Sequence, residues 1–129
     1  MRKAIAAILG LLLTANAVAM IFTPAGWYES VPGIGATGPA NLHFIRDIGC
    51  AYLVAALGLL WLILAPRIAW PAAFAGGAFL ALHALTHLAD AAAGRESGHA
   101  LMGDLGPIFL PAIITIWLAD SARRNSQKE

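Results

Sequence analysis

Imidazole and carboxylate side chains gather in one short apolar stretch of the sequence. His83, His87 and Asp90 are spaced four and three residues apart. An α-helix has about 3.6 residues per turn, so positions i, i+4 and i+7 share one face. Two histidines on adjacent turns of a helix can present two imidazole ligands to one zinc or iron ion. The spacing therefore predicts a polar stripe that can bind a transition metal.

A second stripe with similar spacing comes earlier in the chain. His43 and Asp47 are four residues apart, and Arg46 lies beside them. The apolar runs that carry the two stripes are joined by the short Pro66-Arg67 connection. A connection of this length makes the two helices antiparallel neighbours, so the stripes are expected at similar depth, facing each other. We therefore predict one pocket with these metal ligands: His43, Asp47, His83, His87 and Asp90.

Other polar residues have candidate roles at this predicted pocket. Arg46 and Asn41 are candidate cofactor-binding residues: Arg46 would tune the charge or hold an anion, while Asn41 would line the site or cap the helix that follows. Asp104 is expected at a comparable height, at the start of the fourth apolar run. If the protein is an enzyme, a metal-bound water would react, with Asp47 or Glu29 as general base. The candidate reaction is metal-assisted hydrolysis or oxidation of a lipid or another apolar substrate.

The sequence leaves the identity of the cofactor open. Imidazole and carboxylate ligands suit zinc, iron or copper. Ala84 follows His83, so the helix lacks the glutamate of a metalloprotease motif. The alternative cofactor is a b-type haem held between His43 and His87. A haem needs a flat, largely apolar slot, which the neighbouring charged side chains make less natural.

Two plainer interpretations stand beside these. In the first, the polar groups satisfy one another, with Arg46 pairing with Asp47 or Asp90 and the histidines donating to backbone carbonyls. Charged groups inside membrane helices more often mark function, which favours a binding site. In the second, the chain is a non-enzymatic membrane subunit, either a haem- or quinone-linked redox partner or an accessory protein of a larger complex.

The helices that position these residues are expected to lie in a membrane. Of the 129 residues, 60% are hydrophobic and 12% are charged, whereas soluble proteins have about 45–50% and about 25%. A soluble domain of this size could not bury so much apolar surface. The net charge of +1 and the lack of a basic, aromatic-rich cluster give no reason to expect nucleic acid binding. One cysteine excludes an internal disulfide.

Four apolar runs predict an all-α, integral membrane four-helix bundle, with residues 1–129 as a single transmembrane domain. The predicted helices span residues 4–22, 44–65, 68–93 and 104–120. The first run also resembles a secretory signal peptide, with a small-residue site at Ala15-Asn16-Ala17. Because the run continues to Phe22, about the length of a membrane crossing, we favour an uncleaved helix. A long Gly- and Pro-rich outer loop joins the first two helices.

The distribution of Lys and Arg predicts the orientation in the membrane. Positive residues favour the cytoplasmic side. With both termini cytoplasmic, the outer side carries Arg46 and Arg95, and the inner side carries Arg2, Lys3, Arg67, Arg123, Arg124 and Lys128. All histidines then fall at or near the outer, periplasmic side: His43, His83, His87 and His99.

Two sequence stretches carry a resemblance to other proteins. Residues 37–49 read TGPANLHFIRDIG, and residues 83–90 read HALTHLAD. Together with Trp27-Tyr28 and Pro32-Gly33 they resemble a group of small bacterial four-helix inner-membrane proteins. The resemblance implies an inner-membrane location and no particular activity. It adds importance to Asn41, His43, Arg46, Asp47, His83, His87 and Asp90. Besides the lipid bilayer, the expected partners are further copies of the chain or another membrane protein.

Overall fold

The structure is a computed structural model that describes residues 1–95 and 98–128. In this part of the chain every regular element is helical, which confirms the predicted all-α class. The helices long and apolar enough to cross a membrane are Arg2–Phe22, Leu42–Leu64, Pro66–Ala92 and Ala100–Ser126. The chain therefore has the elements of a multi-pass membrane protein.

The elements follow one another with short connections. The first span is α1 (Arg2–Phe22), followed by the short helix α2 (Pro24–Ser30) and the 3-10 turn η1 (Ile34–Thr37). The second and third spans are α3 (Leu42–Leu64) and α4 (Pro66–Ala92). The last span combines α5 (Gly98–Asp104), the wide π-helical turn η2 (Leu105–Phe109) and α6 (Leu110–Ser126). It begins before the predicted start at residue 104, because α5 and η2 continue the helical path of α6 outward.

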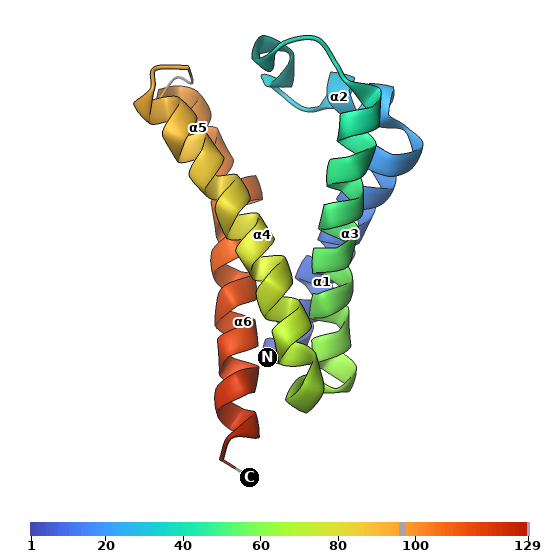
Figure 1. Ribbon diagram of the computed structural model, residues 1–129, viewed down its shortest axis with the longest axis vertical. Helices are drawn as coiled ribbons and strands as arrows, with labels where there is room; N and C mark the ends of the chain where they lie inside the picture. The colour runs from blue at the N-terminus through green and yellow to red at the C-terminus, as the bar shows by residue number, and fades with distance from the viewer. Residues whose placement is uncertain (96–97, 129) are drawn as a thin grey trace.

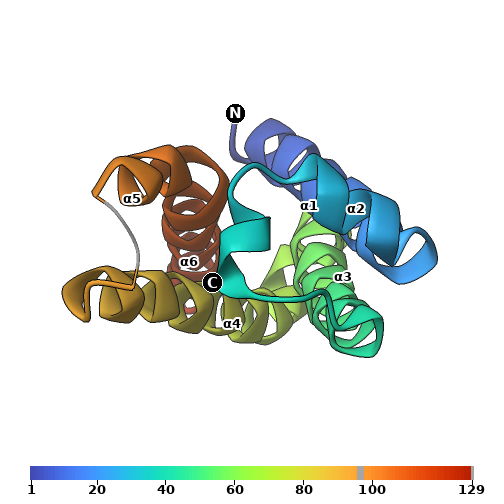
Figure 2. The same ribbon diagram turned by 90° about the horizontal axis from the view of Figure 1, so that it is seen from above.

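The helices pack in chain order rather than as a closed four-membered ring. The main contacts join α1 to α3, α3 to α4, and α4 to α6. Figure 1 shows that the α1–α3 and α4–α6 pairs meet near the chain termini and separate toward α2 and α5. Figure 2, seen along the long axis, shows the same two groups side by side. We call the end with both termini proximal and the end with α2, η1 and α5 distal.

Small residues set where the two pairs meet. A Cβ atom on Gly76 of α4 would lie 2.7 Å from the Ala55 Cα of α3, and one on Gly58 would lie 2.9 Å from the Ala72 carbonyl oxygen. Ala55 and Ala73 are fully buried at this crossing. Without a hydrophobic driving force between helices in lipid, close backbone packing at small residues holds such helices together. The crossing therefore fixes the height of α3 side chains against those of α4.

The segment between the first two spans is tied to α1 at the distal end. The Trp27 indole Nε1 of α2 donates a hydrogen bond to Asn16 Oδ1 at 2.9 Å. The Tyr28 hydroxyl donates to the Gly38 carbonyl oxygen, so the chain after α2 folds back on it. In Figure 2, η1 lies over the interval between the two helix pairs. The long Gly- and Pro-rich segment that the sequence indicated thus contains two short helical elements.

Candidate functional site

The distal half of α4 brings two imidazoles together with a carboxylate from the end of α5. The His83 and His87 rings lie on successive turns, with centroids 5.0 Å apart and an interplanar angle of 78°. The Nδ1 atom of His87 is 2.8 Å from Asp104 Oδ2, and these two side chains are only 26% and 20% exposed. We call His83, His87 and Asp104 the distal cluster. It joins two helical segments that are separated in sequence.

Asp104 is held mostly inside the protein, which makes its pairing with His87 significant. Its Oδ2 atom is enclosed by protein atoms, and within residues 1–95 and 98–128 it accepts no aligned hydrogen bond. The His87 Nδ1 atom approaches this oxygen to 2.8 Å. A buried carboxylate is costly unless a positive or donating group faces it. The His87 ring is the group that faces this carboxylate in the cluster.

A wide helical turn places Asp104 beside α4. The turn η2 starts directly after Asp104, and the Leu110 N–H donates to the Leu105 carbonyl oxygen, five residues back. Pro107 lies within this turn and Pro111 follows it. Proline has no N–H to donate and disturbs the regular helical pattern, so a wider turn relieves the conflict. Both α5 and η2 pack against α4, which brings the carboxylate next to His87.

Aromatic rings hold His83 on the side that faces α3. The Tyr52 ring of α3 meets the His83 ring edge-on, with centroids 5.9 Å apart. Phe79 lies one turn before His83 and stacks on it at 6.3 Å and 16°. Tyr52 and Phe79 also meet edge-on at 5.3 Å. The interpretation of the sequence overlooked Tyr52; its signal was a tyrosine inside an otherwise apolar membrane run.

The stripe on α3 does not join the distal cluster. His43 and Asp47 contact each other, with 3.6 Å between His43 Nε2 and Asp47 Oδ2, and their side chains are 87% and 58% exposed. Within residues 1–95 and 98–128, no group of three or more His, Cys, Asp or Glu side chains is placed to hold one metal ion. The expected five-ligand pocket is therefore not assembled. The physical reason is the separation of α3 from α4 toward the distal end (Figure 1).

The remaining predicted ligand on α4, Asp90, has a different partner. Arg95 donates to Asp90 Oδ1 from Nε at 2.8 Å and lies 2.6 Å away through Nη2. This pair lies on the exposed surface at the end of α4. Asp90 is therefore engaged by Arg95 and is not placed with the two histidines as a metal ligand. Arg46, the partner considered for Asp90 in the sequence, instead donates from Nε to the Ile21 carbonyl oxygen at 3.3 Å. Arg46 thus ties α3 to the end of α1.

The other candidate residues lie outside the distal cluster. Asn41 is the N-cap of α3, where its side chain accepts a hydrogen bond from the Phe44 N–H at 3.1 Å. Glu29 is exposed on α2. Glu96 and the side chain of His99 lie outside the described residues.

We expect Asn41→Ala to lower the free energy of unfolding by about 1 kcal/mol, because the capping acceptor of α3 is lost. Asn41→Asp keeps an acceptor oxygen and serves as the matched control. Denaturant unfolding of the detergent-solubilised variants measures the difference. If Asn41→Ala instead left stability unchanged and removed a bound ligand, Asn41 would belong to the binding site and not to the helix cap.

Comparison of the chain with protein families, with curated proteins and with solved structures gives no match. The resemblance to small bacterial four-helix inner-membrane proteins therefore stays a prediction from the two sequence stretches.

Proposed function

We propose that this chain is a multi-pass protein of the bacterial inner membrane that binds a transition-metal ion at its distal cluster. The distal end faces the periplasm, and both termini lie in the cytoplasm. The support for this orientation is the distribution of Lys and Arg along the chain: the distal end has Arg46 and Arg95, whereas the proximal end has Arg2, Lys3, Arg67, Arg123, Arg124 and Lys128.

The geometry of the two imidazoles carries the proposal of a metal site. Two imidazoles that bind one tetrahedral ion through bonds of about 2.0–2.1 Å have ring centres roughly 5 Å apart. The ring centroids of His83 and His87 are 5.0 Å apart. Both rings come from one rigid helix, and Tyr52 and Phe79 pack against His83. The distance between the ring centres therefore agrees with a shared ion and supports the proposal.

Asp104 has the role of orienting His87. Histidines that bind metals usually engage a carboxylate or carbonyl oxygen through the second ring nitrogen, which fixes the tautomer and raises the basicity of the first. A separation of 2.8 Å between His87 Nδ1 and Asp104 Oδ2 places a carboxylate beside this second nitrogen and supports such a role. With Nδ1 engaged by the carboxylate, Nε2 is the nitrogen that would coordinate. The proposed ligands are thus His83 and His87, and Asp104 orients His87. Asp90, which the sequence predicted as a third ligand on the same helix, is not part of this site.

Two protein ligands leave coordination positions for water and for a substrate. An ion with such open positions lowers the pKa of a bound water and polarises a substrate oxygen. The cluster lies in the distal part of the membrane-spanning helices, so an apolar or lipid substrate could reach it from the outer leaflet. Zinc, iron and copper all suit imidazole ligands. The proposal is therefore a binding site with the open positions that metal-assisted hydrolysis or oxidation would use.

A measurement of the metal content tests this proposal directly. Protein purified in detergent without chelators is expected to contain about one transition-metal ion per chain, as a single site of this kind requires. His83→Ala combined with His87→Ala should remove the ion. His43→Ala is the matched control, because His43 is a histidine at the same end but outside the distal cluster. It should leave the metal content unchanged.

Three outcomes would contradict the proposal. The wild-type chain could bind no ion after incubation with zinc, iron and copper. His43→Ala could remove the ion as fully as the double variant. A Soret band in the optical spectrum would show that the cofactor is haem, the alternative considered from the sequence, and not a bare metal ion.

A further inference from the structure

A groove with an apolar wall opens between α4 and α6 in the proximal half of the molecule, far along α4 from the distal cluster. Its volume is about 690 Å³. Its wall consists of Trp70, Phe74, Ile113, Ile116 and Trp117, and Asp120 and Arg123 also line it. Because α6 runs toward the proximal end, the two charged residues lie at the end of the groove nearest the membrane surface. The groove is thus lined by apolar side chains along most of its length and by charged side chains at one end.

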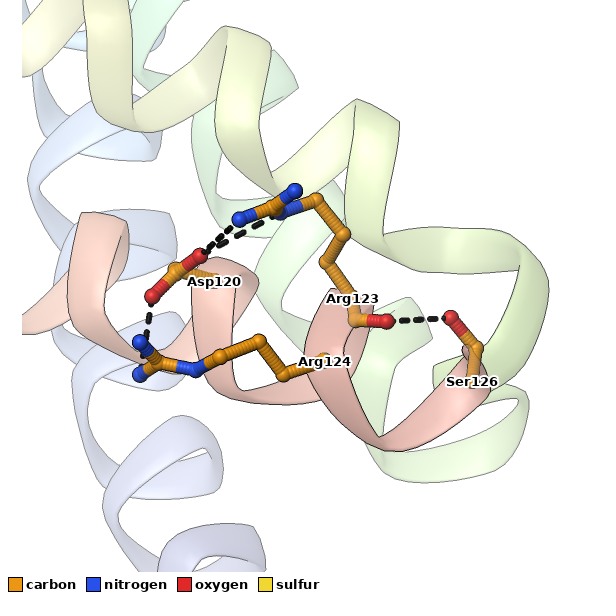
Figure 3. A network of polar contacts seen from close by, with 4 residues as sticks. All are labelled: Asp120, Arg123, Arg124 and Ser126. Atoms are coloured by element: carbon orange, nitrogen blue, oxygen red, sulfur yellow. Dashed lines mark hydrogen bonds and ion pairs between the residues drawn. The ribbon is translucent and has the colours of Figure 1, made fainter. Parts of the chain in front are cut away.

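Arginine side chains outnumber carboxylates at this charged end. Arg123 donates to Asp120 Oδ1 from Nε at 3.2 Å and from Nη2 at 2.8 Å. Arg124 is next to the groove rather than in its wall, and its Nη2 atom lies 2.8 Å from Asp120 Oδ2. Figure 3 shows both guanidinium groups converging on the one carboxylate. From α1, the Arg2 guanidinium lies 5.7 Å from the centre of the Trp117 ring.

This arrangement keeps a positive charge at the end of the groove. One carboxylate cannot neutralise two guanidinium groups, and each guanidinium has five N–H donors, more than a single carboxylate can accept. Asp120 therefore holds Arg123 and Arg124 in place and leaves donors for another anion. Arginine is well suited to phosphate, because its planar donors match two phosphate oxygens at once.

We propose that this groove binds an anionic phospholipid, with one acyl chain along the apolar wall and the phosphate against Arg123 and Arg124. Basic pockets between membrane helices are known to bind anionic headgroups at the cytoplasmic surface. Trp70 and Trp117 have the amphipathic rings that favour the depth of the headgroups. The charge at the end of the groove distinguishes an anionic lipid from a zwitterionic one. The inference does not depend on the metal site.

A second copy of the chain fits this groove less well than a lipid does. In a symmetric dimer the same surface patch of each copy would meet the other. Copies with the same orientation in the membrane would then bring two arginine clusters together, and like charges at close range repel. A phosphate removes this excess of positive charge instead of doubling it. Charge complementarity therefore selects the lipid as the occupant.

Native mass spectrometry of the delipidated full chain, titrated with phosphatidylglycerol or phosphatidylcholine, tests the proposal. The wild-type chain is expected to bind phosphatidylglycerol at least about 10-fold more tightly, given the attraction of juxtamembrane arginines to anionic lipid. Arg123→Gln with Arg124→Gln should bring the two affinities to the same level. The matched control is Arg67→Gln with Lys128→Gln, which removes two positive charges outside the groove. The control should keep the preference.

A second variant tests the apolar part of the site without changing its charges. Ile113 is exposed along the groove, so Ile113→Trp should narrow the groove without disturbing the core and should lower phosphatidylglycerol binding several-fold. Circular dichroism checks that each variant keeps its helices. The proposal is overturned by equal affinities of the wild-type chain for the two lipids, by equal losses in the two charge variants, or by full binding in Ile113→Trp. Displacement of the lipid by millimolar inorganic phosphate would also overturn it.

Discussion

Replacing Asp104 with alanine is expected to weaken metal binding roughly 10- to 100-fold, the usual effect of removing the group that orients a metal-binding histidine. Asp104 Oδ2 lies 2.8 Å from His87 Nδ1. Without the carboxylate, the His87 ring is no longer held in one orientation, and its Nε2 atom is less well placed to coordinate the ion. The ion should still bind through both imidazoles, so the loss is partial. A titration against a chromophoric chelator, on detergent-purified protein, measures the affinity.

Asp90→Ala is the matched control for this prediction. Asp90 also carries a carboxylate at the distal end, but Arg95 engages it on the exposed surface. Its removal should change the metal affinity less than about twofold. Asp104→Asn should fall between the wild-type chain and Asp104→Ala, because the amide keeps a polar oxygen beside His87 without the negative charge. A larger loss in Asp90→Ala than in Asp104→Ala would restore the ligand set first expected from the sequence and contradict the role assigned to Asp104.

The second large effect is expected at the crossing of α3 and α4, where Gly76→Ala should destabilise the fold by about 1–3 kcal/mol, the usual cost of overpacking a close contact. The added Cβ would lie 2.7 Å from the Ala55 Cα and 3.0 Å from its Cβ. A backbone atom cannot move aside as a flexible side chain can, so the two helices must separate. Thermal unfolding in detergent, followed by circular dichroism, measures the loss.

A glycine-to-alanine substitution at a second position, Gly103, is expected to have no destabilising effect. Gly103 lies in α5, and a Cβ there would meet no atom within 4 Å. Gly103→Ala should therefore leave stability unchanged or raise it by about 0.5–1 kcal/mol, because alanine loses less conformational freedom in a helix. Equal melting temperatures for the two variants would show that α3 and α4 do not cross at Gly76. If the crossing is correct, Gly76→Ala should also disturb the contact between Tyr52 and His83.

Individual residues show how far the functional site could be predicted from the sequence. The positions of His83 and His87 are a local matter, because helical periodicity alone places side chains four residues apart on one face. Their rings do lie against each other. His43 and Asp47 have the same periodicity and also contact each other. What periodicity could not show is whether the two stripes meet.

The pairing of Asp104 depended on a contact between distant parts of the chain, whereas that of Asp90 is local. Asp90 has the right helical spacing to join the histidines, yet Arg95, five residues later, engages it at the end of the helix. Asp104 has no periodic relation to His87 and reaches it because α5 and η2 pack against α4. Tyr52 reaches His83 across the helix crossing. The contacts of Asp104 with His87 and of Tyr52 with His83 do not follow from the residues near each partner.

The sequence by itself established that the chain is helical, apolar enough for a membrane, and polar on one face of the third long helix. These properties depend on composition and on a period of about 3.6 residues, which every helix obeys. The tertiary structure decided that the two polar stripes lie apart, that Asp104 and not Asp90 lies beside His87, and that Tyr52 contacts His83. The reason is that glycine contacts such as Gly76 on Ala55 fix where helices cross. The angle that follows from such a crossing sets which side chains meet farther along.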